Sequence, residues 1–126
     1  MESISLKILI CDDSMLIRKK LHDCLQGFCC NDIFEASNGQ EAIDLYKANN
    51  PDLVFMDMIM PVKNGIEAVT EIVQYDPSAR VVILSTVGTK TNLKKALEAG
   101  ACDFIQKPFE DNQIKSVLDK LIERGK

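Results

Sequence analysis

The sequence lacks the long apolar runs and the basic clusters that mark several large classes of protein. Its longest apolar runs are about as long as a β-strand, and the N-terminal segment MESISLKILICDD has an acidic start and a short apolar stretch that ends at two aspartates. Neither a signal peptide nor a transmembrane helix fits this pattern. No run of Lys and Arg is longer than Arg18-Lys19-Lys20, and the net charge is −4. Direct binding to nucleic acid or to a membrane is therefore not expected.

Disulfide spacing is also missing. The chain has five cysteines, an odd number. The sequence pattern predicts that Cys11 and Cys102 lie in strands, Cys24 in a helix, and Cys29 and Cys30 in a loop. We therefore expect reduced thiols and a cytoplasmic location. A zinc site is disfavoured because the cysteines lack metal-pair spacing, and because the single histidine, His22, is far from Cys102 in the sequence and reads as a helix-surface residue.

Apolar, β-rich runs alternate with segments of helical period along the chain. The runs are 6–11, 32–37, 52–57, 80–85 and 102–106. Helix N-caps are expected at Ser14, Asn38 and Asn64, and helix ends near Gly27 and Gly100. This alternation predicts an α/β fold of (βα)₅ type, a doubly wound parallel five-stranded sheet with helices on both faces. The continuous apolarity of LVFM and VVIL indicates that 52–57 and 80–85 are central strands.

The domain organisation follows from length and uniformity. The chain has 126 residues, no shift in composition and no low-complexity segment, so one domain over residues 1–126 is expected. The last helical pattern runs nearly to Lys126 with no linker after it, which favours a domain without an attached output module.

Polar side chains follow most of the predicted strands at their carboxyl ends, where open parallel sheets bind ligands. These residues are Asp12, Asp13, Asp57, Ser85, Thr86 and Lys107. Carboxylates 4 Å apart repel by about 4 kcal/mol per pair at an effective dielectric near 20, so a proton or a hard cation is needed among them. Oxygen ligands favour Mg²⁺ or Mn²⁺ over zinc. A cation, an ammonium and a hydroxyl together suit a phosphoryl group, and Ser85 and Thr86 both remain candidates for the hydroxyl.

With these residues the chain resembles bacterial response-regulator receiver domains, and among them most the single-domain chemotaxis-type regulators. The matching residues are Asp12-Asp13-Ser14, Arg18, Asp57, Met60, Pro61, Gly65, Ser85, Gly100, Ala101, Phe104 and Lys107-Pro108-Phe109. They occur in the family's order and span essentially the whole chain. The resemblance implies a flavodoxin-like sheet with strand order 2-1-3-4-5.

The resemblance also implies a metal site. Asp13 would bind Mg²⁺ directly, Asp12 mainly through water, and Asp57 and the carbonyl oxygen of Ile59 would be further ligands.

The resemblance assigns the phosphoryl chemistry to three residues. Asp57 would attack a phosphohistidine of a partner kinase and form an acyl phosphate. Lys107 would pair with one phosphoryl oxygen, Ser85 would hydrogen-bond another, and the Lys107-Pro108 bond would be cis. The protein would accelerate only its own Mg²⁺-dependent phosphorylation and dephosphorylation, so it is not expected to be an enzyme.

A switch is implied as well. Ser85 would move toward the phosphoryl group and vacate space for the ring of Phe104, which has no hydroxyl and can be held inward only by packing. Phosphorylation would then shift an existing equilibrium. The expected partners are a histidine kinase or phosphotransfer protein and a downstream target, with chemotaxis as one pathway. The alternative for Phe104 is a plain core residue.

The residues beside Asp57 suggest a slow loss of the phosphoryl group. Ile59 and Val87 stand where the family flanks the path of the hydrolytic water, and neither can orient water. Met58 and Ile59 would form the rim of the pocket. Leu16 is a candidate contact for the phosphodonor, and simple packing on the first helix is the alternative.

Three other functions are weighed against this one. A flavodoxin-type cofactor module needs a phosphate-binding loop where this chain has Asp12 and Asp13. A haloacid-dehalogenase-like phosphatase needs a second acid where Ile59 stands. A phosphorylation-independent interaction domain of the same fold is the third alternative.

Overall fold

The protein is a single sheet flanked by helices. The computed structural model describes residues 6–27, 32–86 and 89–124, without the side chains of 121–124. The strands are β1 (Lys7–Cys11), β2 (Asp32–Ala36), β3 (Leu53–Asp57), β4 (Val81–Ser85) and β5 (Asp103–Gln106). The helices are α1 (Met15–Gln26), α2 (Gly39–Asn49), α3 (Gly65–Tyr75), α4 (Lys90–Ala99) and α5 (Asp111–Arg124). None of the helices in these described ranges is both long and apolar enough to cross a membrane.

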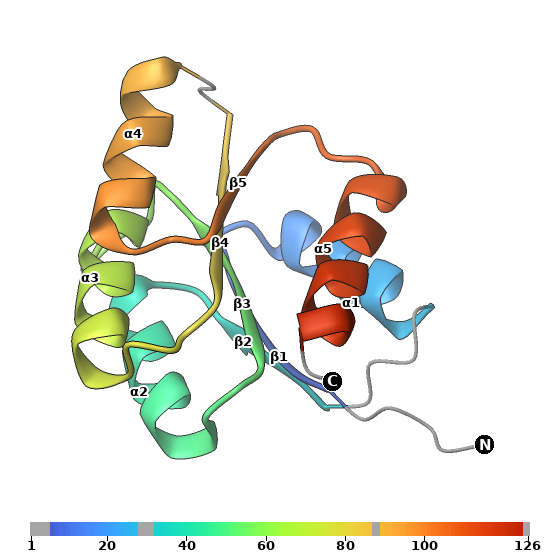
Figure 1. Cartoon of the computed structure of the whole chain (residues 1–126), viewed down its shortest axis with the longest axis horizontal. Helices are drawn as coiled ribbons and strands as arrows, with labels where there is room; N and C mark the ends of the chain where they lie inside the picture. Colours follow the sequence, from blue (N-terminus) through green and yellow to red (C-terminus); the bar gives the residue numbers. More distant parts are fainter. Residues whose placement is uncertain (1–5, 28–31, 87–88, 125–126) are drawn as a thin grey trace.

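The strands form one parallel sheet in the order β2-β1-β3-β4-β5. Helices α1 and α5 cover one face, and α2, α3 and α4 cover the other (Figure 1). The chain moves from β1 to β2 in one direction along the sheet and from β2 to β5 in the other. Right-handed crossovers therefore place α1 on one face and α2, α3 and α4 on the other, and α5, which follows β5, lies on the face of α1. The predicted doubly wound fold and its strand order are confirmed.

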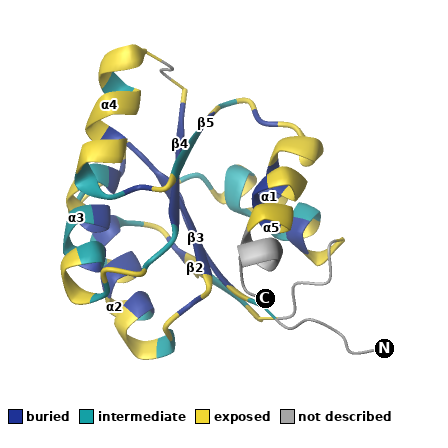
Figure 2. Ribbon diagram, in the orientation of Figure 1, coloured by how far each residue is buried: buried dark blue, intermediate teal, exposed yellow. Residues whose placement is uncertain are grey.

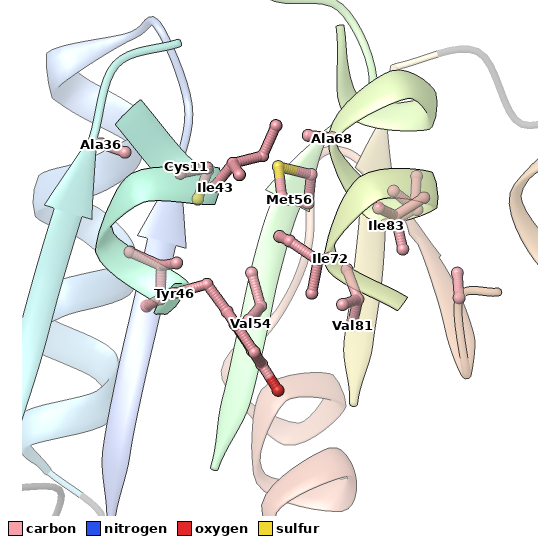
Figure 3. Close-up of a cluster of buried hydrophobic side chains, with 14 of the residues drawn as sticks. Cys11, Ala36, Ile43, Tyr46, Val54, Met56, Ala68, Ile72, Val81 and Ile83 are labelled. Carbon is pink, nitrogen blue, oxygen red and sulfur yellow. The ribbon is translucent and has the colours of Figure 1, made fainter. Parts of the chain in front are cut away.

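The core lies on both faces of the sheet. Every residue of β3 and β4 is buried, as their continuous apolar runs predict (Figure 2). Successive side chains point to opposite faces, so Val54 and Met56 pack toward α2 and α3, as Figure 3 shows, while Leu53 and Phe55 pack toward α1 and α5. Packing in these two apolar layers fixes the strands, and with them the carboxyl ends of the strands at one edge of the sheet.

Three helices begin at the predicted polar caps. The side chains of Ser14, Asn38 and Asn64 accept hydrogen bonds from the backbone N–H groups of Ile17, Glu41 and Glu67. These bonds satisfy amides that the first helical turn leaves unpaired. Gly100 ends α4 with a φ of 114°, a left-handed conformation that residues with a Cβ rarely adopt.

The strand boundaries differ slightly from the predicted runs. All but β2 begin one residue later than predicted, and β2 ends one residue earlier. Cys102 illustrates the reason, because its N–H still donates to the carbonyl oxygen of Val81 at 2.9 Å although it precedes the regular ladder of β5. A residue just before a strand can form one hydrogen bond with the sheet without belonging to the regular pairing of that strand. The predicted loop cysteines Cys29 and Cys30 lie outside the described residues.

Candidate functional site

The carboxyl ends of the strands bring the predicted site residues to one edge of the sheet. Asp12 follows β1 directly, Asp57 is the last residue of β3 and Ser85 is the last residue of β4. Lys107 follows β5. Asp12 and Ser85 are each 1% exposed and Asp57 is 8% exposed. Such burial is costly for a carboxylate, so each of the two acids needs a partner.

Gly65 explains how the chain after Asp57 turns so closely into α3. Its N–H donates to the carbonyl oxygen of Met58 at 2.8 Å, while the N–H of Met58 donates to Leu84 at 3.0 Å. A Cβ at position 65 would overlap the carbonyl oxygen of Asp57 and lie 2.9 Å from the Cα of Met58. Glycine is therefore required by close backbone approach, and this contact fixes the backbone that carries Asp57.

Lys107 is the partner of both buried carboxylates. Its Nζ lies 2.6 Å from Oδ2 of Asp12 and 3.0 Å from Oδ1 of Asp57. Its own N–H donates to the carbonyl oxygen of Ser85 at 2.7 Å, and the Lys107-Pro108 peptide bond is cis, as the resemblance implies. The side chains of Asp12 after β1 and of Asp57 at the end of β3 thus meet the ammonium group of Lys107 from the β5–α5 loop, an arrangement typical of charge-assisted hydrogen bonding.

The pKa values of this group reflect burial and mutual charge. Burial raises the pKa of Asp57, and the Asp12 carboxylate raises it further, while the hydrogen bond from Lys107 opposes both effects. Burial alone lowers the pKa of Lys107, but its contacts with Asp12 and Asp57 outweigh this and hold it above its ordinary value. Lys107 therefore carries its positive charge between the two acids at neutral pH.

The acidic residues also have the composition of a site for a hard cation. Asp12, Asp13 and Asp57 each offer a carboxylate oxygen, and these oxygens lie within 4.8 Å of one another. Asp13 is exposed, so the group opens to solvent. The carbonyl oxygen of Ile59, two residues after Asp57, is the further ligand that the resemblance implies. An all-oxygen donor set fits Mg²⁺ or Mn²⁺.

Several contacts that the sequence did not indicate hold Asp12 in place. Ser14 N–H donates to its Oδ1 at 2.8 Å, and Nη1 of Arg18 donates to its carbonyl oxygen at 2.7 Å. Arg18 in turn contacts Glu35 on β2 at 3.1 Å, and Glu35 lies 3.2 Å from Nδ1 of His22. In the sequence Arg18 is indicated only as part of the family pattern, and its spacing from Ser14 in the first helix is the signal for its contact with Asp12.

The two predicted switch residues lie on the same face of the sheet. Phe104 pairs in register with Ile83, two residues before Ser85 on the neighbouring strand. The alternation along β4 therefore places Ser85 and Phe104 toward the face covered by α4. Phe104 is half-buried and packs against the core on that face, while Thr86 is exposed. Burial at the strand end makes Ser85 the better candidate for the pocket hydroxyl.

Of the two residues predicted to form the rim of the pocket, Ile59 has the exposure that a rim position requires and Met58 does not. Ile59 is 66% exposed, whereas Met58 is 8% exposed and belongs to the core between the sheet and α2 and α3. Met58 turns inward because its backbone bonds to Leu84 and Gly65 continue the path of β3 for one more residue. Leu16 is exposed, as a contact for a partner requires, and Val87 lies outside the described residues.

Comparison with known proteins gives a consistent result. The family described as "Response regulator receiver domain" matches residues 8–119. The chemotaxis protein CheY of Thermotoga maritima is 39% identical over 115 residues, which are 91% of this chain and 96% of that protein. The CheY protein of Bacillus subtilis is 39% identical over 116 residues, covering 92% and 97%.

A solved structure has the same fold. CheY in the "CheX-CheY-BeF3-Mg+2 complex" from Borrelia burgdorferi superposes with a TM-score of 0.88 at 32% identity, covering 93% of this chain and 89% of that one. Together with the strand order and the residues at the sheet edge, these similarities show that the chain belongs to the response regulator receiver domain family.

Proposed function

We propose that this protein is a phosphoryl-accepting switch of a two-component system, and that Asp57 is the acceptor. The observation that carries the proposal is the meeting of Lys107 with the carboxylates of Asp12 and Asp57, with Asp13 beside them. A buried carboxylate close to two further acids is costly even when an ammonium holds it, and groups with pKa values perturbed in this way cluster at functional sites.

The proposed reaction is a transfer between two covalent partners. A carboxylate oxygen of Asp57 attacks the phosphorus of a phosphohistidine, forming a P–O bond while the P–N bond breaks and its electron pair leaves with the imidazole. Lys107 compensates the negative charge of the phosphoryl oxygens. Asp12, whose Oδ2 lies 2.6 Å from Nζ of Lys107, holds this ammonium beside Asp57, whose Oδ1 lies 3.0 Å from the same Nζ. The Ser85 hydroxyl would donate a hydrogen bond to a further phosphoryl oxygen. A Mg²⁺ ion bound by Asp12, Asp13, Asp57 and the Ile59 carbonyl would supply electrostatic stabilisation of the transferring group.

The output proposed for this site is a change in protein binding. Ser85 and Phe104 share a face of the sheet next to α4, so a movement of Ser85 toward the phosphoryl group would change the packing available to the Phe104 ring. The partners are then a histidine kinase or phosphotransfer protein and a downstream target protein in the cytoplasm. The similarity to CheY proteins favours chemotaxis as the pathway. The protein acts on itself and is not a turnover enzyme.

The test is phosphorylation by a small-molecule donor. Wild-type protein incubated with acetyl phosphate and Mg²⁺ should gain the mass of one phosphoryl group, measured on the intact protein. Asp57→Asn should gain none, and Asp119→Asn, which changes an exposed aspartate of α5, should behave as the wild type. Omission of divalent cation should abolish the gain. A wild type that stays unmodified under these conditions contradicts the proposal.

A further inference from the structure

Helix α1 reaches across to the loop that carries Lys107. Helices α1 and α5 lie side by side on one face of the sheet, and this loop enters α5 beside them (Figure 1). Nζ of Lys20, on α1, donates a hydrogen bond to the carbonyl oxygen of Phe109 at 3.0 Å. The same ammonium lies 4.4 Å from the centroid of the Phe109 ring. One side chain therefore holds both the backbone and the ring of Phe109.

Phe109 is the apolar anchor of the loop. It is 2% exposed and belongs to the core between the sheet and α1 and α5. It stands two residues after Lys107, so the loop is fixed on one side by the Lys107 N–H bond to Ser85 and on the other by Phe109. A hydrogen bond from an ammonium to a carbonyl, combined with a cation–π contact, adds to the packing of the ring.

The contact is specific to Lys20 and is not a general property of the basic run. Its neighbour Lys19 points elsewhere, with a side chain that is 73% exposed and an ammonium 3.6 Å from Asp23, one turn along the same helix. Such an exposed pair is worth little. The two adjacent lysines thus have the same charge and different contacts, which makes Lys19 a matched control.

We propose that Lys20 is a positioning residue, which acts through Phe109 to keep the β5–α5 loop where Lys107 meets Asp12 and Asp57. This inference rests on the proposed function, because it gives Lys20 a part in preparing the phosphoryl-accepting site. Lys20 itself touches none of the reacting groups. The ammonium of Lys107 must stay within hydrogen-bond distance of two carboxylates, and displacements of about 1 Å in such sites can reduce rates by about 100-fold.

The first test compares phosphorylation rates. Lys20→Met keeps most of the aliphatic stem and removes the ammonium, and it should slow phosphorylation by acetyl phosphate and Mg²⁺ by about tenfold. Lys19→Met should stay within about twofold of the wild type, since its pair is exposed. Lys20→Arg should restore most of the rate, because a guanidinium can donate to the carbonyl and stack on the ring. A Lys20→Met rate within twofold of the wild type would overturn the proposal.

A second readout separates positioning from general destabilisation and from failure of the proposed function. Hydrogen exchange of the Lys107 amide should rise at least about tenfold in Lys20→Met, while the amide of Phe55 in β3 should keep its wild-type rate. Equal acceleration at both amides, or none at Lys107, would contradict the positioning role. If the wild type gains no phosphoryl group, the proposed function fails, and the exchange at Lys107 alone then decides whether Lys20 positions the loop.

Discussion

Replacing Lys107 by methionine should strongly destabilise the protein in the absence of divalent cations. The substitution keeps an unbranched side chain of similar length and removes the ammonium that lies 2.6 Å from Asp12 and 3.0 Å from Asp57. Both acids would then be buried beside each other without a positive partner. Breaking a buried charge pair in this way typically costs 3–5 kcal/mol.

The free energy of protonating an aspartate sets an upper limit on this loss of stability. A carboxyl group that becomes too costly as a charge can take up a proton, and protonating an aspartate of ordinary pKa 3.8 at pH 7 costs about 4 kcal/mol. We therefore expect Lys107→Met to lower the free energy of unfolding by about 3–4 kcal/mol at pH 7. Addition of Mg²⁺ should recover part of the loss, because a cation bound to the same carboxylates stabilises the folded state.

Lys63 provides the control for this experiment. Its Nζ lies 2.6 Å from Oε2 of Glu71, the same distance as Lys107 from Asp12, but the side chains are 30% and 42% exposed. Lys63→Met should therefore cost less than about 1 kcal/mol. Urea unfolding followed by circular dichroism, with EDTA and with Mg²⁺, measures both variants. Losses that agree within about 1 kcal/mol would refute the idea that burial makes the Lys107 contacts important.

Three further outcomes are expected. Tyr46→Phe removes a 2.7 Å hydrogen bond to Asp76 and should lower the free energy of unfolding by about 1 kcal/mol at pH 7. Because this bond lowers the pKa of Asp76, the stabilisation it gives is present above pH 3.8 and is lost as the pH falls further. The difference in the free energy of unfolding between variant and wild type should therefore disappear when urea unfolding is measured at acid pH. A difference that is independent of pH contradicts this. Gly65→Ala should cost about 1–3 kcal/mol and slow phosphorylation, since its Cβ would push against the backbone of Asp57, and a wild-type rate and stability would show that this approach is not needed. Ile59→Asn should lose the phosphoryl group several times faster than the wild type in a decay assay with Mg²⁺, because an exposed amide at this position can orient water. Slower decay in the variant would contradict the idea that Ile59 slows hydrolysis.

The sequence was sufficient for the parts of the fold and site that depend on local pattern. Continuous apolar runs identified β3 and β4 as buried strands, and the caps at Ser14, Asn38 and Asn64 marked helix starts because their oxygens serve amides three residues on. Parallel strands then bring their carboxyl ends together, which gathers the acids and the lysine at one edge. The strand order came from the family resemblance and not from the pattern.

The contacts that the sequence pattern does not reveal depend on tertiary structure. Lys20 and Phe109 are 89 positions apart, and within the run Arg18-Lys19-Lys20 nothing distinguishes the lysine that contacts Phe109 from the one that contacts Asp23. The sequence does not distinguish a rim position from a core position for Met58, because an apolar residue after a strand end can turn either way. Its direction is set by backbone bonds to other strands and loops, which no local pattern encodes.

The central claim is that the phosphoryl group resides on Asp57, and reductive trapping tests it most directly. Protein phosphorylated by acetyl phosphate and Mg²⁺ is treated with borohydride, which reduces an acyl phosphate of aspartate to homoserine, and the peptides are then sequenced by mass spectrometry. The account predicts homoserine at position 57 and at no other position. Homoserine at a different aspartate, or a phosphorylated protein with aspartate intact at position 57, would contradict it.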